Sequence, residues 1–287
     1  MSEVDAGWVA LSGIRGMGAA TLTELVRRFG DAAGVLAADD ATLLAVPRVG
    51  KKTLAAIREV DLAATRCQLE AWIAQGVTTL PLSADAFPDQ LRPPLPDAPA
   101  ILYVRGALPY EAGVAIVGTR RPSDAGVKIA HTLGKRLAAA GYIVVSGLAL
   151  GIDGAAHQGA LDIPNGQTVA VLGSGVLNVY PPEHTDLAAE IVARGALVSE
   201  VAPDVTVSTP WLVARNRLIS ALAEAVIIVE TADDGGAMHA ARAAYKQGRR
   251  LIALDAPHTG NQLLIREGHA APLALDLTNL AGVLSHV

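Results

Sequence analysis

The sequence predicts an α/β fold, namely a doubly wound and mostly parallel Rossmann-like sheet preceded by a small all-α domain. After residue 113, short apolar runs alternate with helical patterns, which is typical of a parallel sheet covered by helices on both faces. Hydrophobic residues make up 51% of the chain but aromatic residues only 3%, so the core must consist of Ala, Val and Leu. Residues 9–60, by contrast, show helical periodicity without a strand pattern.

The length and composition favour two domains in a cytoplasmic protein. The 287 residues accommodate one medium and one small domain, and we expect a helical domain at 1–66 and a Rossmann-like domain at 67–287. A single cysteine excludes an internal disulfide and suits a reducing compartment. Neither a signal peptide nor an apolar run of about 18 residues is evident, so no membrane association is expected. A net charge of −5 argues mildly against nonspecific coating of nucleic acid.

The helical domain contains two rounds of helix, glycine turn and helix. Leu22, Leu25 and Phe29 recur at helical spacing, and Gly30 stands where a helix would end. The second round passes through the stretch 47–53, which reads PRVGKKT. The pattern resembles a helix-hairpin-helix, whose amides can hold a backbone phosphate. A helical packing domain with glycines at its turns explains the pattern equally well.

The prolines of residues 67–113 forbid a long helix, and the pieces 77–82 and 100–104 read as edge strands or strand-like connections. Beyond them the predicted strands span 114–117, 142–146, 168–172, 196–199, 225–229 and 250–254. The predicted helices span 124–140, 152–161, 185–194, 214–223 and 237–247.

A glycine or polar residue follows nearly every predicted strand, at the sheet edge where open α/β folds bind ligands. Backbone amides at such turns bind anions, and Arg120 and Arg121 would supply matching charge. Further cations stand at 215–217 and 242–250. Neither the dinucleotide glycine triplet nor a complete Walker A motif is present. These features together favour a phosphate-rich ligand and no nucleotide cofactor.

Asp153 and His157 are four residues apart and share a helix face. An acid/base pair or part of a metal site is one interpretation. The commoner one is Asp153 as an N-cap with His157 packed beside it, and no further His or Cys cluster completes a metal site. Glu200 and Glu230 end strands at the crevice rim, where they could do acid/base chemistry or orient the arginines.

The chain resembles the DNA-processing protein A family, called DprA or Smf. Residues 117–120 (VGTR) are similar to its VGSR/VGTR loop, and residues 146–157 (SGLALGIDGAAH) to its SGLARGID..AH motif. Residues 172–181 (LGSGVLNVYP) are similar to LG.GLD..YP, and 215–219 (RNRLI) to RNRII. Gly260, Asn261 and the leucines that follow are similar to a late G.N.LI motif.

The resemblance implies a single-stranded DNA binding protein without known enzymatic activity, cofactor or metal. Proteins of this family protect incoming DNA and help load the RecA recombinase in natural transformation, and they form homodimers through the Rossmann-like domain. Lys246 is a candidate from charge alone. The candidate DNA-binding residues are Gly118, Thr119, Arg120, Arg121, Ser146, Gly147, Gly151, Ile152, Asp153, Gly173, Gly175, Arg215, Asn216, Arg217 and Lys246.

The sequence departs from the family at several turns. Leu150 stands where the family usually has Arg, which removes one expected cation, and Leu212-Val213 replaces Phe-Pro. Residues 235–238 and 255–256 also differ from the usual turns. No winged-helix module of the kind common in the family is expected within these residues.

Two other functions compete with this interpretation. Glu200, Glu230 and the Gly235-Gly236 turn motivate a Rossmann-like nucleoside-monophosphate phosphoribohydrolase, although the PGG.GT..E signature of those enzymes is missing. A structural adaptor that binds through its helical domain is the weaker alternative.

Overall fold

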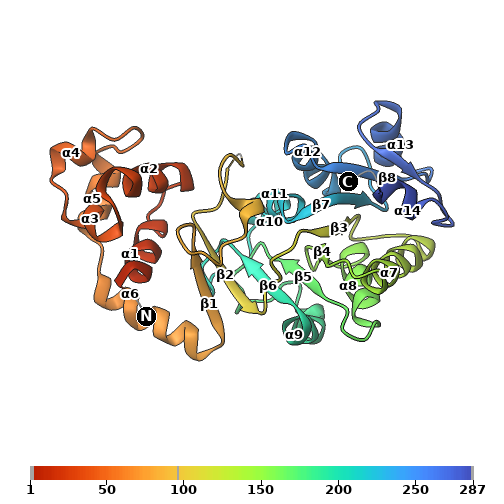
Figure 1. Ribbon diagram of the computed structural model, residues 1–287, viewed down its shortest axis with the longest axis horizontal. Coiled ribbons are helices and arrows are strands. Elements are labelled where there is room, and N and C mark those ends of the chain that lie inside the picture. Colours follow the sequence, from red (N-terminus) through yellow and green to blue (C-terminus); the bar gives the residue numbers. More distant parts are fainter. Residues whose placement is uncertain (1–2, 96, 286–287) are drawn as a thin grey trace. The chain divides into compact units, whose positions relative to one another are not determined.

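The structure is a computed structural model that describes residues 3–95 and 97–285, with side chains from residue 6 onward (Figure 1). The chain divides into two compact units, Met1–Tyr103 and Val104–Val287. Helix α6 (Leu62–Ala74) runs through residue 66, and the domain boundary expected there stays a prediction. No helix within the described ranges combines the length and apolar character needed to cross a membrane.

The first unit is helical up to residue 74. Asp31, Asp39 and Asp61 each accept a hydrogen bond from a first-turn amide and so begin α3, α4 and α6. The turn before α2 contains Gly16 and the turn before α5 contains Arg48, both with positive φ. The helices are α1 (Glu3–Ser12), α2 (Ala19–Phe29), α3 (Ala32–Ala37), α4 (Asp40–Leu44), α5 (Lys51–Arg58) and α6. Strand β1 (Val77–Pro81), the 3₁₀ turn η1 (Asp89–Leu91) and the start of β2 (Ile101–Gly106) follow.

The second unit alternates strands and helices. Its strands are β3 (Gly113–Val117), β4 (Val144–Ser146), β5 (Thr168–Val171), β6 (Ala196–Ser199), β7 (Ala223–Ile228), β8 (Arg250–Leu254) and β9 (Ala271–Leu273). Its helices are α7 (Asp124–Ala139), α8 (Ile152–Leu161), α9 (Thr185–Arg194), α10 (Thr209–Ala214), α11 (Asn216–Ala221), α12 (Ala237–Lys246), α13 (Thr259–Arg266) and α14 (Leu280–Leu284), with the 3₁₀ turn η2 (Pro182–His184) before α9.

The strand order in this unit is β6-β5-β4-β3-β7-β8-β9, and the pairs from β6 to β9 are parallel. The chain therefore builds outward from β3 through β4, β5 and β6, and then returns to the other side of β3 with β7. Val114 of β3 pairs with Val144 on one side and with Ala225 on the other. Because the order reverses at β3, the carboxyl ends of β3, β4 and β7 are where this topology opens a crevice. Figure 1 shows β3 between β4 and β7.

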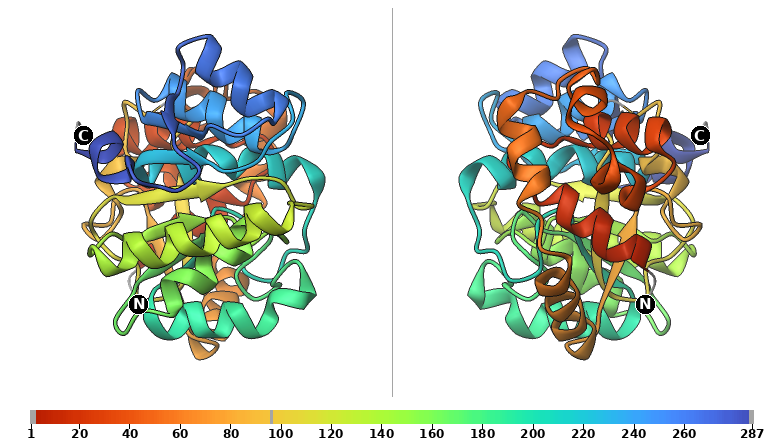
Figure 2. Two further views of the ribbon diagram at one scale, coloured as in Figure 1. Left: turned by 90° about the vertical axis from the view of Figure 1, so that its right-hand side faces the viewer. Right: turned by 90° about the vertical axis from the view of Figure 1, so that its left-hand side faces the viewer.

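Helices α7 and α8 lie side by side against the sheet (Figure 2, left). Gly134 of α7 lies against the backbone of Ala156, and Gly159 of α8 lies against the backbone of His131. A side chain at either position would push the two helices apart. This close approach fixes the N-termini of both helices beside the carboxyl ends of β3 and β4.

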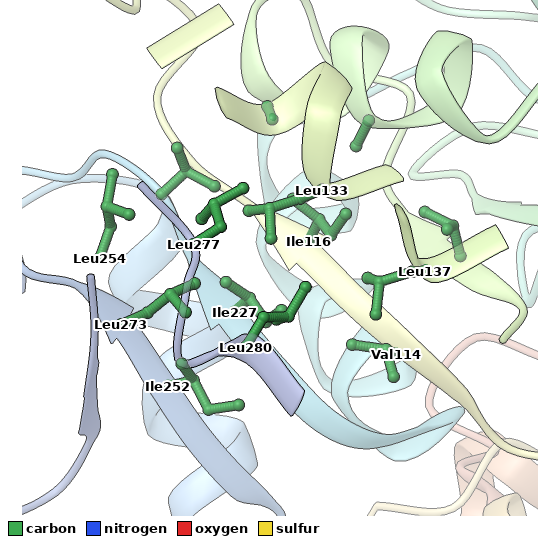
Figure 3. Close-up of a cluster of buried hydrophobic side chains, with 14 of the residues drawn as sticks. Val114, Ile116, Leu133, Leu137, Ile227, Ile252, Leu254, Leu273, Leu277 and Leu280 are labelled. Atoms are coloured by element: carbon green, nitrogen blue, oxygen red, sulfur yellow. The ribbon is translucent and has the colours of Figure 1, made fainter. Parts of the chain in front are cut away.

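A buried cluster joins the sheet to its covering helices (Figure 3). Val114 and Ile116 of β3 gather there with Leu133 and Leu137 of α7, and Ile227 of β7 belongs to the same cluster. Each of these side chains is at most 1% exposed. Burial of aliphatic side chains of this size stabilises the fold by about 1.5–3 kcal/mol each. The crevice is therefore built on a rigid base.

The predicted fold class is confirmed, and each predicted strand is present within about three residues of its expected ends. The helix predicted at 214–223 is present as α11, whereas the short helix α10 that precedes it was not predicted. Strand β9 was not predicted. It has three residues and contains Pro272, and a Pro removes the backbone donor that marks an ordinary strand.

Candidate nucleic-acid interface

A cavity of about 450 Å³ opens at the carboxyl ends of β3 and β7. Four segments line it. They include glycines and arginines that were predicted from the sequence as binding residues. The segments are the loop after β3 (Gly118–Arg121), the loop after β7 with the start of α12 (Thr231, Ala232, Gly235–Ala237, His239), the α10–α11 corner (Thr209, Leu212, Val213, Arg215, Asn216) and the stretch after β4 (Ala149, Asp153).

The loop after β3 presents Arg120 and Arg121 to solvent. Its backbone is anchored, since the Thr119 amide donates to the Glu230 carbonyl at 2.8 Å and the Arg121 amide donates to Thr119 Oγ1 at 3.2 Å. Both arginines are exposed, and neither guanidinium is paired with a carboxylate of the described residues. These two cations are therefore available to an anionic ligand.

The loop after β4 is closed upon itself. Ser146 Oγ donates to the Ile116 carbonyl at 2.6 Å. The Gly147 and Ala149 amides both donate to Asp153 Oδ2, at 3.1 and 3.4 Å. Gly151 and Ile152 start α8, with the Ile152 side chain fully buried. Of the residues in this segment, Ala149 and Asp153 line the cavity, and Ser146, Gly147, Gly151 and Ile152 lie outside its lining.

Arg215 lines the cavity although only 5% of its surface is exposed. Its Nη1 donates to the carbonyls of Gly147 and, at 2.6 Å, Val171, and its Nη2 lies 3.9 Å from Asp153 Oδ2. Burial lowers the pKa of the Arg215 guanidinium, and the charge of Asp153 opposes that shift. Burial likewise raises the pKa of Asp153, against the effect of Arg215. The pair ties the ends of β4 and β5 together.

The remaining candidates differ in their relation to the cavity. Asn216 lines it, whereas Arg217 does not, and Arg217 Nη2 lies 2.5 Å from Glu200 Oε2. Gly173 and Gly175 follow β5 and lie against Leu212 and Pro203, outside the lining. Lys246 is exposed at the last residue of α12 and is likewise outside.

The far wall of the crevice depends on Asn261, to which no role was assigned from the sequence. This residue is fully buried, and its Oδ1 accepts a hydrogen bond from the Thr231 amide at 3.0 Å. Its Nδ2 donates to the carbonyls of Ile228, Val229 and Leu254. Asn261 therefore joins the ends of β7 and β8 and shapes the loop that lines the cavity. The available signal was its place in the late motif formed by Gly260, Asn261 and the leucines that follow.

Asp153 and His157 form neither of the sites considered for them. Gly151 is the N-cap of α8, so the interpretation of Asp153 as the cap is wrong. His157 Nδ1 lies 2.7 Å from Thr168 Oγ1, which gives its own proton to the Val144 carbonyl. Burial lowers the pKa of His157 to about 3, so its ring is neutral. No cluster of three metal-binding side chains is found within the described ranges.

The fold and the crevice define an α/β protein with exposed cations at the edge of its parallel sheet, and a helical unit precedes it in the chain. Residues 78–283 match the family of the DNA recombination-mediator protein A, and the chain belongs to that family. Residues 9–60 match the SAM-like helix-hairpin-helix tandem. The resemblance seen in the sequence motifs is thereby confirmed.

The chain is 34% identical over 211 residues to the DNA processing protein DprA of Bacillus subtilis, covering 71% of this chain and 70% of that protein. It is 38% identical over 197 residues to the protein Smf of Escherichia coli, covering 66% of this chain but only about half (52%) of the relative.

Two solved structures share the fold. The X-ray structure of DprA from Streptococcus pneumoniae has a TM-score of 0.75 and 26% identity, and the match covers 95% of each chain. DNA processing protein A from Helicobacter pylori has a TM-score of 0.65 and 30% identity, covering 73% of this chain and 96% of that one. The Helicobacter structure is described for its unique single-stranded DNA binding mode.

Proposed function

We propose that the crevice binds single-stranded DNA through its phosphates, and that Arg120 and Arg121 make the principal contacts. The observation that carries this proposal is the pair of exposed guanidinium groups on the loop that lines the cavity. Guanidinium groups bind phosphate oxygens in bidentate fashion. The DNA-binding role described for the Helicobacter pylori protein supports the same ligand.

A polymer suits this crevice better than a nucleotide cofactor. The glycine loops lack the dinucleotide pattern, and aromatic residues that would stack bases are scarce in the second unit. Recognition through phosphates carries little sequence information. We therefore expect binding that depends weakly on sequence and strongly on salt.

The protein acts without catalysis in this proposal. Glu200 pairs with Arg217, Glu230 is hydrogen-bonded to Ser123, and His157 is buried beside Thr168. Each group considered for acid/base work thus has a structural partner. The phosphoribohydrolase alternative has no positive observation in its favour beyond these carboxylates.

The wider role follows the family to which the chain belongs. We propose that the protein protects incoming single-stranded DNA and delivers it to the RecA recombinase during natural transformation and recombination. A cytoplasmic homodimer formed through the Rossmann-like unit is part of the same proposal. Gly118, Thr119 and Asn216 would contribute to the DNA contact, while Ser146, Gly147, Gly151, Ile152, Asp153 and Arg215 would support it.

The first prediction concerns Arg120→Ala, tested by the binding of a fluorescent oligo-dT strand and a matching duplex at several salt concentrations. We expect the wild type to prefer the single strand, and the variant to lose about tenfold in affinity, which equals about 1.4 kcal/mol. The slope of log K against log salt should become shallower by about 0.7, since one phosphate contact to a single strand is lost.

Lys135→Ala is the matched control, because Lys135 is an exposed cation of α7 outside the cavity lining. It should leave both the affinity and the salt slope unchanged. Equal binding by wild type and Arg120→Ala would overturn the proposed site. Release of free base from nucleoside monophosphates by the wild type would favour the enzyme instead.

A further inference from the structure

Glu230 follows β7, and its side chain reaches the N-terminus of α7. The residue is only 4% exposed. Its Oε2 accepts a hydrogen bond from the Ser123 amide at 2.9 Å, and its Oε1 accepts one from Ser123 Oγ. Ser123 is the N-cap of α7, and its hydroxyl also accepts from the Gly126 amide at 3.0 Å. The carboxylate therefore lies where the first-turn amides of α7 attract negative charge.

The surrounding chain is shaped to admit this carboxylate. Gly126 lies in the first turn of α7, and a Cβ there would overlap the Glu230 carboxyl group. Strand β7 is hydrogen-bonded to β3 in parallel, so both strands end side by side. The Glu230 carbonyl also accepts from the Thr119 amide at 2.8 Å. The segment 119–123 is thus attached to residue 230 at both ends, with Arg120 and Arg121 between the attachments.

In doubly wound folds the N-terminus of the helix that follows a central strand commonly binds a ligand phosphate. Here the protein's own carboxylate occupies that position. Neither Ser123 nor Glu230 is part of the cavity lining, so a ligand in the cavity meets Arg120 and Arg121 instead of the helix amides. The geometry separates the cationic loop from the helix end that would hold a nucleotide phosphate.

We propose that Glu230 is a positioning residue for polymer binding, which acts by filling the anion position at the start of α7 and holding Arg120 and Arg121 toward the crevice. This proposal rests on the proposed function, since it specifies how the same site selects its ligand. His258 Nε2 lies 3.4 Å from Glu230 Oε1, so both carboxylate oxygens have partners. Glu230 therefore acts through the loop, without touching DNA.

The test compares Glu230→Ala, Glu230→Gln and Ser123→Ala in oligo-dT binding. Gln can accept a hydrogen bond from the Ser123 amide and donate one to Ser123 Oγ, so the loop should stay in place. We expect Glu230→Ala to weaken binding about tenfold and Ser123→Ala about threefold, while Glu230→Gln stays within about twofold of wild type. The double variant Glu230→Ala with Ser123→Ala should bind about as weakly as Glu230→Ala alone, because both substitutions break the same contact between Glu230 and Ser123.

Thr168→Val is the control for a general loss of stability. Thr168 lies at the start of β5, at the opposite end of the strand from the crevice, and its hydroxyl also bonds buried partners. Binding is compared at a temperature where circular dichroism shows all variants folded. Thr168→Val should bind like the wild type despite a lower melting temperature.

Three results would overturn the proposal while leaving the proposed function intact. The first is normal oligo-dT binding by Glu230→Ala or by Ser123→Ala. The second is an equal loss of affinity in Glu230→Ala and Glu230→Gln. The third is a loss of affinity in Thr168→Val as large as that in Glu230→Ala. If the wild type itself fails to bind oligo-dT, or Arg120→Ala binds normally, the proposed function fails instead. If Glu230→Ala does not fold, the oligo-dT affinities of Ser123→Ala and Glu230→Gln test the proposal instead.

Discussion

The loops after β3 and after β4 look alike in the sequence but have opposite characters in the structure. Each follows a short apolar strand, contains glycine and leads into a helix. The loop after β3 carries Arg120 and Arg121 outward into solvent. The start of the loop after β4 is buried, where Asp153 binds the Gly147 and Ala149 amides and Arg215 binds the Gly147 carbonyl. In the proposed binding mode, the loop after β3 faces the ligand and the loop after β4 supports it.

The difference shows where the charge of the crevice comes from. Arg215 lies beside Asp153 and Arg217 beside Glu200, so each of these pairs is close to neutral as a unit. The Arg215 guanidinium is buried, and its Nη1 already donates to two carbonyls. The positive potential at the cavity mouth therefore comes mainly from the loop after β3. In the proposed binding mode the two arginines of the RNR motif support the structure, and the GTRR segment supplies the exposed cations.

The largest effect should come from Arg215→Ala, which attacks the supporting loop. The substitution removes the cation beside the buried Asp153 carboxyl group. It also removes the donor that the carbonyls of Gly147 and Val171 share. Removing one partner of a buried pair costs about 3–5 kcal/mol. We expect urea unfolding to show a loss of stability of that order, with a loss of DNA binding as a consequence.

The double variant Asp153→Asn with Arg215→Met separates charge from packing. It removes both charges, so no uncompensated carboxylate remains, and it should recover part of the stability lost in Arg215→Ala. A loss below about 1 kcal/mol in Arg215→Ala would contradict the supporting role. The loop after β4 would then not have the supporting role that distinguishes it from the loop after β3.

A smaller, pH-dependent effect is expected from His157 of α8, the helix that follows the supporting loop. Burial lowers its pKa from 6.5 to about 3 in the folded protein. The unfolded chain therefore binds the extra proton between these values, and the folded protein loses stability as the pH falls below 6.5. The slope contributed by this one group approaches about 1.4 kcal/mol per pH unit.

His157→Asn removes the titration while its amide can still donate to Thr168 Oγ1. The variant should be less stable than wild type at pH 7.5, and the difference should shrink as urea unfolding is repeated at pH 6.5, 5.5 and 4.5. Other acidic groups titrate in both proteins and cancel. A difference that stays constant with pH would show that folding does not lower the pKa of His157.

The regular part of the fold was predictable because buried parallel strands read as apolar runs, as in residues 114–117 and 250–254. Helix α10 was not predicted, since it has only six residues and ends directly before α11 begins. The sequence also predicted which loops meet, because the carboxyl ends of parallel strands share one edge. It could not show that Arg215 is buried and Arg120 exposed, because that depends on the carbonyls of Gly147 and Val171, which come from other strands.

The smallest effect should come from Leu150→Arg, which makes the supporting loop resemble the ligand-facing one. Leu150 is 39% exposed and lies with Arg120 and Tyr180 around a small cavity beside the main one. A guanidinium there adds a cation to the rim, where the related family motif has Arg. We expect oligo-dT affinity to rise about threefold and the salt slope to steepen by about 0.7. Val127→Arg places the same charge on exposed α7 outside the cavity lining and should change neither quantity. An equal gain in both variants would mean that net charge governs binding and that the position of the cation on the loop is unimportant.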